Sequence, residues 1–467
     1  MKPHKSPAQA SGGRKPAVTP ADQKRINFCN VIRTLTHPAR LLVFGACILM
    51  IGTHSAFGQE NPDPGDKPRV EFELKDGDRV VFLGNTFIER MQRYGYVETM
   101  LTTRWPDRKI IFRNLGWSGD TVWAESRNLF DLSRSRATPS KGYTRMIEHV
   151  GRIKPTVIFL GYGNNEAFEG EKGLPAFIKQ YEKLMDDLRK VSAKGLRFVV
   201  IRPYLHRGRG KAVAHQNRNV VEYRDALLKL AIRRKLFTFV PFLDLSAETN
   251  ILDGETKAND SNRFEPGYLP ATLFEGVHLS EAGYRASFSH WLVQINRSFQ
   301  PGILPVLAFK ASGELLEPPG FLDVKVMRRD GGLNITAQRM ALVDSGMMFH
   351  VSGLPAGKYT LKIDGKPVRT ADVKDAAWEF YGSYGPDAAQ YEKLRAAVVA
   401  KNQLYFYSWR PQNTTYLLGF RKHEQGQNAK EISEFAKLVA DKEREIDRLK
   451  KPVSRTYELI RVKKGNK

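Results

Sequence analysis

Cysteine is nearly absent from this chain of 467 residues. The two cysteines, Cys29 and Cys47, both lie within the first 58 residues. The rest of the chain therefore has no disulfide framework, no thiolate zinc site and no cysteine nucleophile. Its stability must come from packed cores, and a length of 467 residues with 41% hydrophobic residues is sufficient for two or three domains.

Long hydrophobic runs are also lacking. The apolar run at residues 41–52 is short for a membrane-spanning helix, which needs roughly 20 residues. It follows a basic stretch and precedes small residues at Ala56 and Gly58, which predicts a signal peptide over residues 1–58 with cleavage near Gly58. An uncleaved anchor is the alternative. Both readings export the globular part of the chain. With cleavage we expect a secreted, periplasmic or cell-envelope location, with peripheral or no membrane contact.

Acidic residues are too few to balance the basic ones. The chain has 74 Lys and Arg against 50 Asp and Glu, a formal net charge of +24, of which +17 remains after residues 1–58 are removed. Such a balance favours anionic partners. Because the sequence shows no nucleic-acid-binding module, we expect an anionic polysaccharide, a cell-wall polymer or membrane headgroups, and no nucleic acid.

The pattern between residues 69 and 300 predicts an α/β layered domain with a mainly parallel sheet. Short β-branched runs alternate there with amphipathic stretches, and apolar residues over 177–191 recur at spacings of four and three, which is typical of a buried helix face. The expected strands are residues 79–83, 110–114, 157–160, 198–201 and 237–242.

Beyond residue 300 the pattern changes. Residues 301–375 alternate as strands with turn signals such as Asp364-Gly365, which predicts a small β-rich module. Residues 376–467 are expected to form a helical C-terminal region, with an amphipathic helix over 429–449. An aromatic stretch at 405–413 is expected to pack this region on the main domain, and a lid or sugar platform over a cleft is the alternative.

Four short blocks follow one another in a fixed order, at residues 80–87, 114–121, 161–166 and 275–278. The first three lie at the ends of predicted strands, and ligands of open parallel sheets bind outside the carboxyl ends of the strands. The order resembles that of the SGNH (GDSL-like) hydrolases, a family of ester hydrolases. The resemblance implies a flavodoxin-like three-layer domain over residues 69–300, followed here by the β-rich module and C-terminal helix.

The resemblance places Thr86 where the family has its nucleophilic serine, because Gly84-Asn85-Thr86 stands in place of Gly-Asp-Ser. Threonine supplies a hydroxyl, but its branched Cβ is stiff and adds a methyl group. The implied oxyanion hole consists of the backbone N–H groups of Thr86 and Gly119 and the side chain of Asn165.

The last block implies the base. Glu275 and His278 occupy the places of the family's Asp-x-x-His pair, so His278 would take the proton from Thr86 while Glu275 orients its ring. The glutamate is one methylene longer than the usual aspartate. We also expect Asn85, Arg207 and Arg209 to bind substrate, the two arginines forming a cationic rim after the fourth strand; a solvated loop is the alternative for that segment.

These residues predict an exported SGNH-type esterase that deacylates carbohydrate or cell-envelope esters through an acyl-enzyme on Thr86, acting on an acylated carbohydrate or another small ester. The chemistry needs no metal and no organic cofactor. The alternative is a catalytically impaired relative that binds glycan or an anionic polymer. Three departures from the family pattern suggest it: Thr86 stands in place of serine, and Glu275 and Asn85 each stand in place of an aspartate.

Overall fold

The structure is a computed structural model whose chain divides into two compact units, Met1–Arg69 and Val70–Lys467. The first unit, which contains the whole predicted signal peptide, lies outside the described residues. Within the part that is described, no helix is long and apolar enough to cross a membrane. The described residues are 72–128, 136, 138–206, 211–239, 273–274, 278–285, 287, 291, 305–317, 320–329, 332–343, 346–373, 377–383, 385–410 and 429–462.

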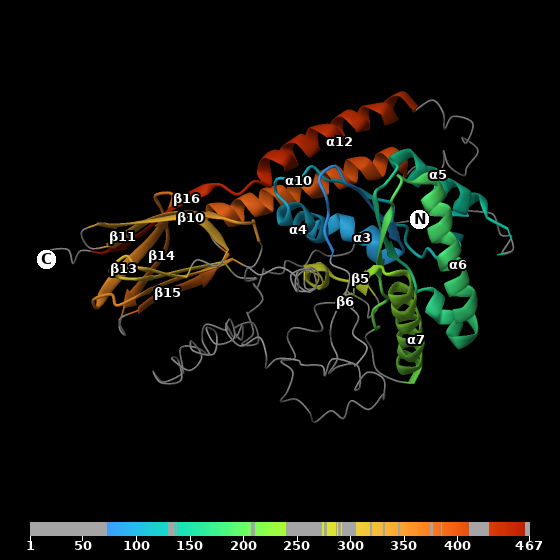
Figure 1. The fold of residues 1–467 in the computed structure, drawn as a ribbon, viewed down its shortest axis with the longest axis horizontal. Helices are drawn as coiled ribbons and strands as arrows, with labels where there is room; N and C mark the ends of the chain where they lie inside the picture. Colours follow the sequence, from blue (N-terminus) through green and yellow to red (C-terminus); the bar gives the residue numbers. More distant parts are fainter. Residues whose placement is uncertain are drawn as a thin grey trace, which may run out of the picture. The chain divides into compact units, whose positions relative to one another are not determined.

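A parallel sheet forms the centre of the first domain (Figure 1). The order of its strands is β2-β1-β3-β4-β5, and every neighbouring pair is parallel. This is the flavodoxin-like order, so the predicted fold class is confirmed. The strands are β1 (Arg79–Gly84), β2 (Ile111–Asn114), β3 (Val157–Gly161), β4 (Arg197–Ile201) and β5 (Phe237–Phe239); residues 240–242, predicted to extend the last one, are not described.

Helices cover both faces of this sheet because successive side chains of each strand point to opposite faces. Val80 and Phe82 of β1 pack in one core with the first two helices, whereas Val81 and Leu83 pack in the other with the later helices. The first group comprises α3 (Thr86–Tyr94) and α4 (Tyr96–Arg104), and the second comprises α5 (Lys141–Ile153), α6 (Gly170–Val191) and α7 (Lys211–Arg234).

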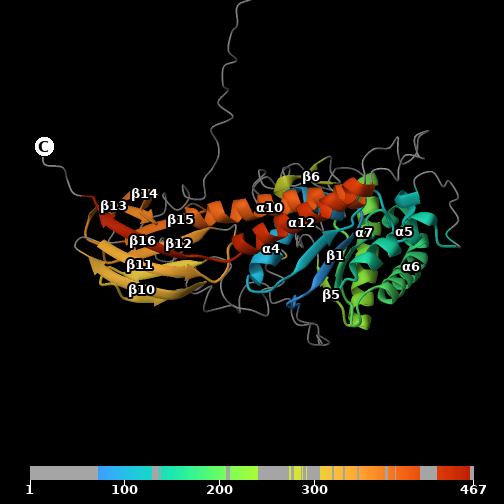
Figure 2. The ribbon, with the colours of Figure 1, turned by 90° about the horizontal axis from the view of Figure 1, so that it is seen from above.

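A β-sandwich follows, as the strand pattern after residue 300 predicts. Its sheets, β10-β11-β16-β13-β14 and β15-β12-β8-β9, enclose one hydrophobic core (Figure 2). Asp364 and Gly365 join β13 to β14 with φ values of 48° and 76°, as a tight type I′ hairpin requires. The strands are β8 (Val306–Lys310), β9 (Leu315–Glu317), β10 (Phe321–Arg329), β11 (Gly332–Arg339), β12 (Met347–Ser352), β13 (Gly357–Ile363), β14 (Lys366–Val373), β15 (Ala377–Gly382) and β16 (Ser454–Arg461).

Two of these strands lie in the range 376–467, which we expected to be helical. β15 pairs with β12, and β16 lies between β11 and β13 near the end of the chain. The partners of β16 precede it by about a hundred residues or more, so no local pattern could reveal the pairing. The last strand of the sandwich thus follows two long helices in the chain.

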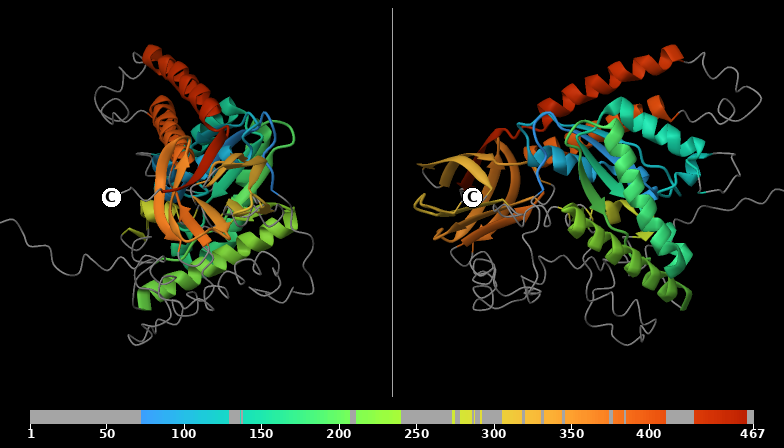
Figure 3. Two further views of the ribbon diagram at one scale, coloured as in Figure 1. Left: turned by 90° about the vertical axis from the view of Figure 1, so that its left-hand side faces the viewer. Right: turned by 45° about the vertical axis from the view of Figure 1, so that its right-hand side comes forward.

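Those helices are α10 (Pro386–Trp409) and α12 (Ala429–Leu449), which run side by side (Figures 1 and 3). The bounds of α12 confirm the predicted amphipathic helix. α10 packs against α3, α4 and β2 of the first domain. Its Lys401 donates from Nζ to Oε1 of Glu98 on α4 at 2.5 Å, and Asn402 Nδ2 donates to the other carboxylate oxygen at 2.9 Å. This buried network fixes α10 to the first domain.

The aromatic stretch at 405–413 falls at the end of α10. Tyr405 and Trp409 pack against the core formed by the sheet and helices α5, α6 and α7. The expected packing of this stretch on the main domain is therefore confirmed as far as residue 410, and residues 411–413 lie outside the described range.

The buried pair of Lys401 and Glu98 gives a stability prediction. Their side chains are only 1% and 7% exposed, so Lys401→Met leaves a buried carboxylate without its cation and should lower the free energy of unfolding by about 3–5 kcal/mol. Lys393→Met on the exposed side of the same helix is the matched control, with a change within about 0.5 kcal/mol. Urea unfolding measures both; equal losses in the two variants would contradict the assignment.

Candidate active site

Thr86 lies at the carboxyl end of β1, where it is the first residue of α3. Asn85 is the N-cap of this helix, and its side-chain oxygen accepts the N–H of Phe87 at 3.1 Å. Asn85 is only 3% exposed, so the structure shows it in a capping role. Its predicted contact with substrate stays a prediction.

Gly119 lies within hydrogen-bond distance of the Thr86 hydroxyl. Its backbone N–H donates to Thr86 Oγ1 at 3.0 Å. The backbone of Gly119 is left-handed, with φ of 73°, and an added Cβ would approach Ser126 Oγ to 3.2 Å, so glycine suits this position. The N–H of Trp117 donates to the Gly84 carbonyl at 2.9 Å and ties the same loop to the end of β1. The predicted oxyanion donor Gly119 is thus hydrogen-bonded to the predicted nucleophile Thr86.

Asn165, after β3, reaches the same loop. Its Nδ2 donates to the carbonyl oxygen of Asp120, the residue after Gly119, at 2.9 Å. A side-chain amide has two N–H groups, so this contact uses one of them. The structure therefore brings together Thr86, Gly119 and Asn165, which the sequence places in three separate blocks.

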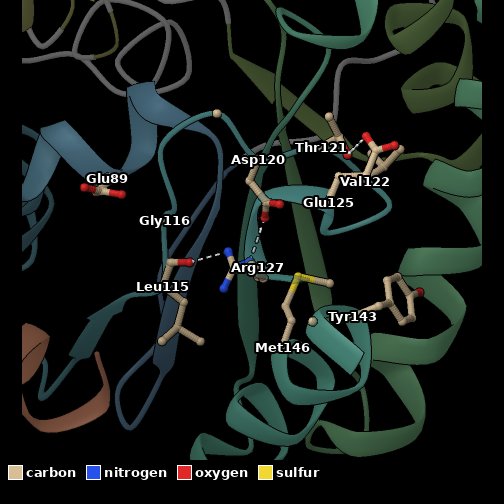
Figure 4. Close-up of polar contacts among 12 residues, drawn as sticks. Glu89, Leu115, Gly116, Asp120, Thr121, Val122, Glu125, Arg127, Tyr143 and Met146 are labelled. Carbon is tan, nitrogen blue, oxygen red and sulfur yellow. Dashed lines mark hydrogen bonds and ion pairs between the residues drawn. The ribbon is translucent and has the colours of Figure 1, made fainter. Parts of the chain in front are cut away.

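A buried ion pair lies behind the loop (Figure 4). Arg127, on the short 3-10 helix Glu125–Asn128, donates from Nε to Asp120 Oδ2 at 2.6 Å and from Nη2 to the Leu115 carbonyl at 2.7 Å. Burial by itself would lower the pKa of Arg127, but the Asp120 carboxylate outweighs it and raises the pKa, which keeps the guanidinium charged. Arg127 thus joins the two ends of the loop formed by residues 115–120, which we call the oxyanion loop after the predicted role of Gly119.

Glu166 connects the loops that follow β2 and β3. Its carboxylate accepts the backbone N–H of Val122 at one oxygen and that of Gly163 at the other, each at 2.8 Å. The side chain is fully enclosed, and burial raises the pKa of Glu166 to about 7. Glu166 therefore holds the backbone of both loops.

His278 lies on β7 (His278–Leu279), which pairs with β6 (Leu273–Phe274) and packs against α3. The following helical turn fixes this strand, because the Tyr284 hydroxyl donates to the carbonyl of Phe87 at 2.8 Å and the two rings stack at 5.4 Å. His278 is thereby attached to the helix that begins at Thr86. Glu275 lies outside the described residues, so its predicted pairing with His278 stays a prediction.

The segment after β4 is described as far as His206. This histidine is 5% exposed, and its backbone N–H and carbonyl are both hydrogen-bonded to the Asn217 side chain, at 2.8 and 2.9 Å. Burial and, secondarily, the nearby His278 lower the pKa of His206. His206 therefore lies near the predicted base, whereas the predicted rim residues Arg207 and Arg209 lie outside the described range.

Three residues that connect the site to its surroundings carry no sequence signal that we recognised. Glu89, one turn into α3, accepts the Ser118 N–H at 2.6 Å, and Arg410 at the end of α10 reaches the same carboxylate oxygen. Arg127 is the third. Each is a charged residue in a segment with several others, and its neighbours in the sequence do not indicate its distant partner. Only related sequences or the fold could identify its role.

Comparison with known proteins confirms the resemblance. Residues 88–286 match the family model of the GDSL-like lipases and acylhydrolases. A solved structure described as a gut microbial diltiazem-metabolizing enzyme shares the fold, with a TM-score of 0.63 and 15% identity over 84% of this chain and 99% of its own. No curated protein matches the sequence.

Two further solved structures show smaller overlaps. An acetyl xylan esterase is 18% identical, with a TM-score of 0.33 over 46% of this chain and 99% of its own. A GDSL-like lipase from Bacteroides thetaiotaomicron is 16% identical, with a TM-score of 0.29 over 48% of this chain and 89% of its own.

The raised pKa of Glu166 predicts a pH-dependent stability. The folded protein binds this proton more tightly than the unfolded chain does, so the contribution is present below pH 4.5 and is lost as the pH rises through 7. Relative to Glu166→Gln, the parent should lose about 3 kcal/mol of unfolding free energy between pH 4.5 and 7.5. Glu171→Gln, an exposed position on α6, is the control. Parallel stability profiles for parent and Glu166→Gln would contradict this prediction.

Proposed function

We propose that the domain matched over residues 88–286 by the GDSL-like lipase/acylhydrolase family model makes this chain an exported esterase that deacylates carbohydrate or cell-envelope esters. The observation that carries the proposal is the hydrogen bond from the Gly119 N–H to Thr86 Oγ1. The Asn165 side chain is hydrogen-bonded to Asp120, the next residue of the oxyanion loop. A hydroxyl in contact with one backbone N–H, with a side-chain amide attached to the adjoining residue, is compatible with the arrangement that acyl transfer requires.

In the proposed reaction, Thr86 Oγ1 attacks the acyl carbonyl while His278 takes its proton. The backbone N–H groups of Thr86 and Gly119 and the side chain of Asn165 stabilise the negative charge on the carbonyl oxygen. His278 returns the proton to the leaving alcohol, and an acyl group stays on Thr86. A water molecule, deprotonated by His278, then attacks this ester, and His278 passes the proton to Thr86 Oγ1 as the C–O bond breaks and the acid is released. Glu275 would orient the imidazole throughout.

The choice of substrate rests on charge and on the predicted leader. The residues after the leader carry +17, which favours an ester on an acidic polymer, and export would bring the protein to polysaccharide or envelope material. The predicted rim of Arg207 and Arg209 would contribute to the same preference.

Two specific contacts favour the alternative, a relative that binds glycan and does not catalyse its hydrolysis. Asn165 directs an amide hydrogen to the Asp120 carbonyl, and the Gly119 N–H is directed to Thr86 itself. Both donors must turn toward a substrate oxygen before they can act on it, and the Thr86 methyl must fit beside that oxygen.

Variants of the predicted nucleophile separate the two functions. Hydrolysis of p-nitrophenyl acetate and acetylated xylan is measured with the mature protein. Thr86→Ala should lower kcat by about 10³-fold or more because the acyl-enzyme can no longer form, whereas Thr86→Ser keeps the hydroxyl and should stay active. Full activity of Thr86→Ala would refute the assignment. An inactive parent with an active Thr86→Ser would show a disabled scaffold.

The oxyanion role of Asn165 predicts a separate kinetic signature. Asn165→Ala should lower kcat by about 10²- to 10³-fold and leave KM nearly unchanged, because the donor acts on charge that develops only in the transition state. Asn164→Ala is the matched control, since the neighbouring Asn164 donates instead to the Tyr204 carbonyl at 2.8 Å. Equal losses in the two variants would indicate a general disturbance of this turn and would count against the role.

A further inference from the structure

We infer that Arg410, at the C-terminal end of α10, is a positioning residue that holds the oxyanion loop of residues 115–120 in its working geometry. The inference deepens the proposed function, on which it rests. It gives a catalytic consequence to a helix that lies beyond the residues matched by the GDSL-like family model, which end at 286.

The first contact runs through a single carboxylate oxygen. Arg410 Nη1 donates to Glu89 Oε2 at 2.6 Å, and the backbone N–H of Ser118 donates to the same oxygen, also at 2.6 Å. Ser118 immediately precedes Gly119, whose N–H reaches the Thr86 hydroxyl. Arg410 is therefore connected through one side chain to the peptide unit that immediately precedes the one carrying the Gly119 N–H.

The second contact fixes Trp117 in the same loop. The guanidinium carbon of Arg410 lies 3.6 Å from the centroid of the Trp117 ring, and the Trp409 ring lies at 6.1 Å. The guanidinium of Arg127 lies 5.4 Å from the same ring. An arginine stacked on an indole combines cation–π attraction with close packing, and a lysine at the same place keeps only the charge.

Burial strengthens the ion pair between Arg410 and Glu89. The Glu89 and Arg410 side chains are 9% and 23% exposed, so water screens their interaction less than it screens a surface pair. Without the guanidinium, Glu89 would be a largely buried carboxylate beside the loop, and hydration of that charge would favour rearrangement of the Ser118 contact.

Arg410 comes from a well-anchored element. The Lys401, Asn402 and Glu98 network holds α10 on α4, and the Arg410 N–H still donates to the Phe406 carbonyl at 2.9 Å, as in a helix. Arg410 and Glu89 are 321 positions apart in the chain. Helix α10, which follows the strand β15 of the sandwich, thus supports the loop through Glu89 and Trp117. Arg127 supports the same loop through Asp120 and Leu115.

The kinetic test uses the full mature chain with p-nitrophenyl acetate. Because a displacement of about 1 Å can cost 10²-fold in rate, Arg410→Ala should lower kcat by about 10- to 100-fold with KM within about threefold. Arg410→Lys should fall between parent and Arg410→Ala, since it keeps the charge opposite Glu89 and loses the stacking. Lys393→Ala, exposed on the same helix, is the control and should match the parent.

Hydrogen exchange supplies a readout that does not need turnover. Backbone amides of residues 115–120 should exchange at least about tenfold faster in Arg410→Ala than in the parent, with amides of β3 unchanged, because local opening of the loop becomes easier. Faster exchange together with the fall in kcat supports the inference. Unchanged exchange, or faster exchange with parental kcat, overturns it.

The same pair of measurements separates the inference from the proposed function. A parent that hydrolyses neither p-nitrophenyl acetate nor acetylated xylan refutes the esterase, and exchange then decides by itself whether Arg410 holds the loop. An active parent whose Arg410→Ala variant is unaltered in both readouts keeps the esterase and removes Arg410 from it.

Discussion

Parallel pairing of β1 with both β2 and β3 is the constraint on which the site depends. It makes three strands end at one edge of the sheet, so the segments that begin there meet although the chain separates them. The two strands approach each other closely at that edge. Gly84 of β1 pairs with Gly161 of β3, and a Cβ on Gly84 would lie 2.3 Å from the carbonyl oxygen of Gly161. A Cβ on Gly116 would likewise lie 2.3 Å from the Glu89 nitrogen. Main chain packs on main chain here, which leaves the following loop little freedom.

Charged groups then fix what the backbone has brought together. Asp120 with Arg127, Glu166 with two backbone N–H groups and Glu89 with Arg410 each join two segments around the Thr86 hydroxyl. Buried charges are costly unless their partners are in place, so each one selects the arrangement in which it is satisfied.

The C-terminal part of the chain belongs to both domains. β16 lies in the middle of a sandwich sheet, while α10 reaches the sheet domain through Lys401 and Arg410. The N-terminal end of α10 is bound to the sandwich by an ion pair of Asp387 with Arg455 of β16 at 2.8 Å. One helix therefore contacts both the sandwich and the segment beside the loop of residues 115–120.

The sequence by itself determined the parallel sheet, the amphipathic helices and the blocks around Thr86, Gly119, Asn165 and His278, because hydrophobic periodicity and short motifs are local properties that a single chain displays. Only the tertiary structure decided that β16 completes the sandwich, that Arg127 joins the two ends of the loop formed by residues 115–120, and that Arg410 contacts Glu89 beside this loop. Those facts depend on contacts between residues far apart in the chain, and a lone arginine or a short alternating strand gives no indication of its distant partner.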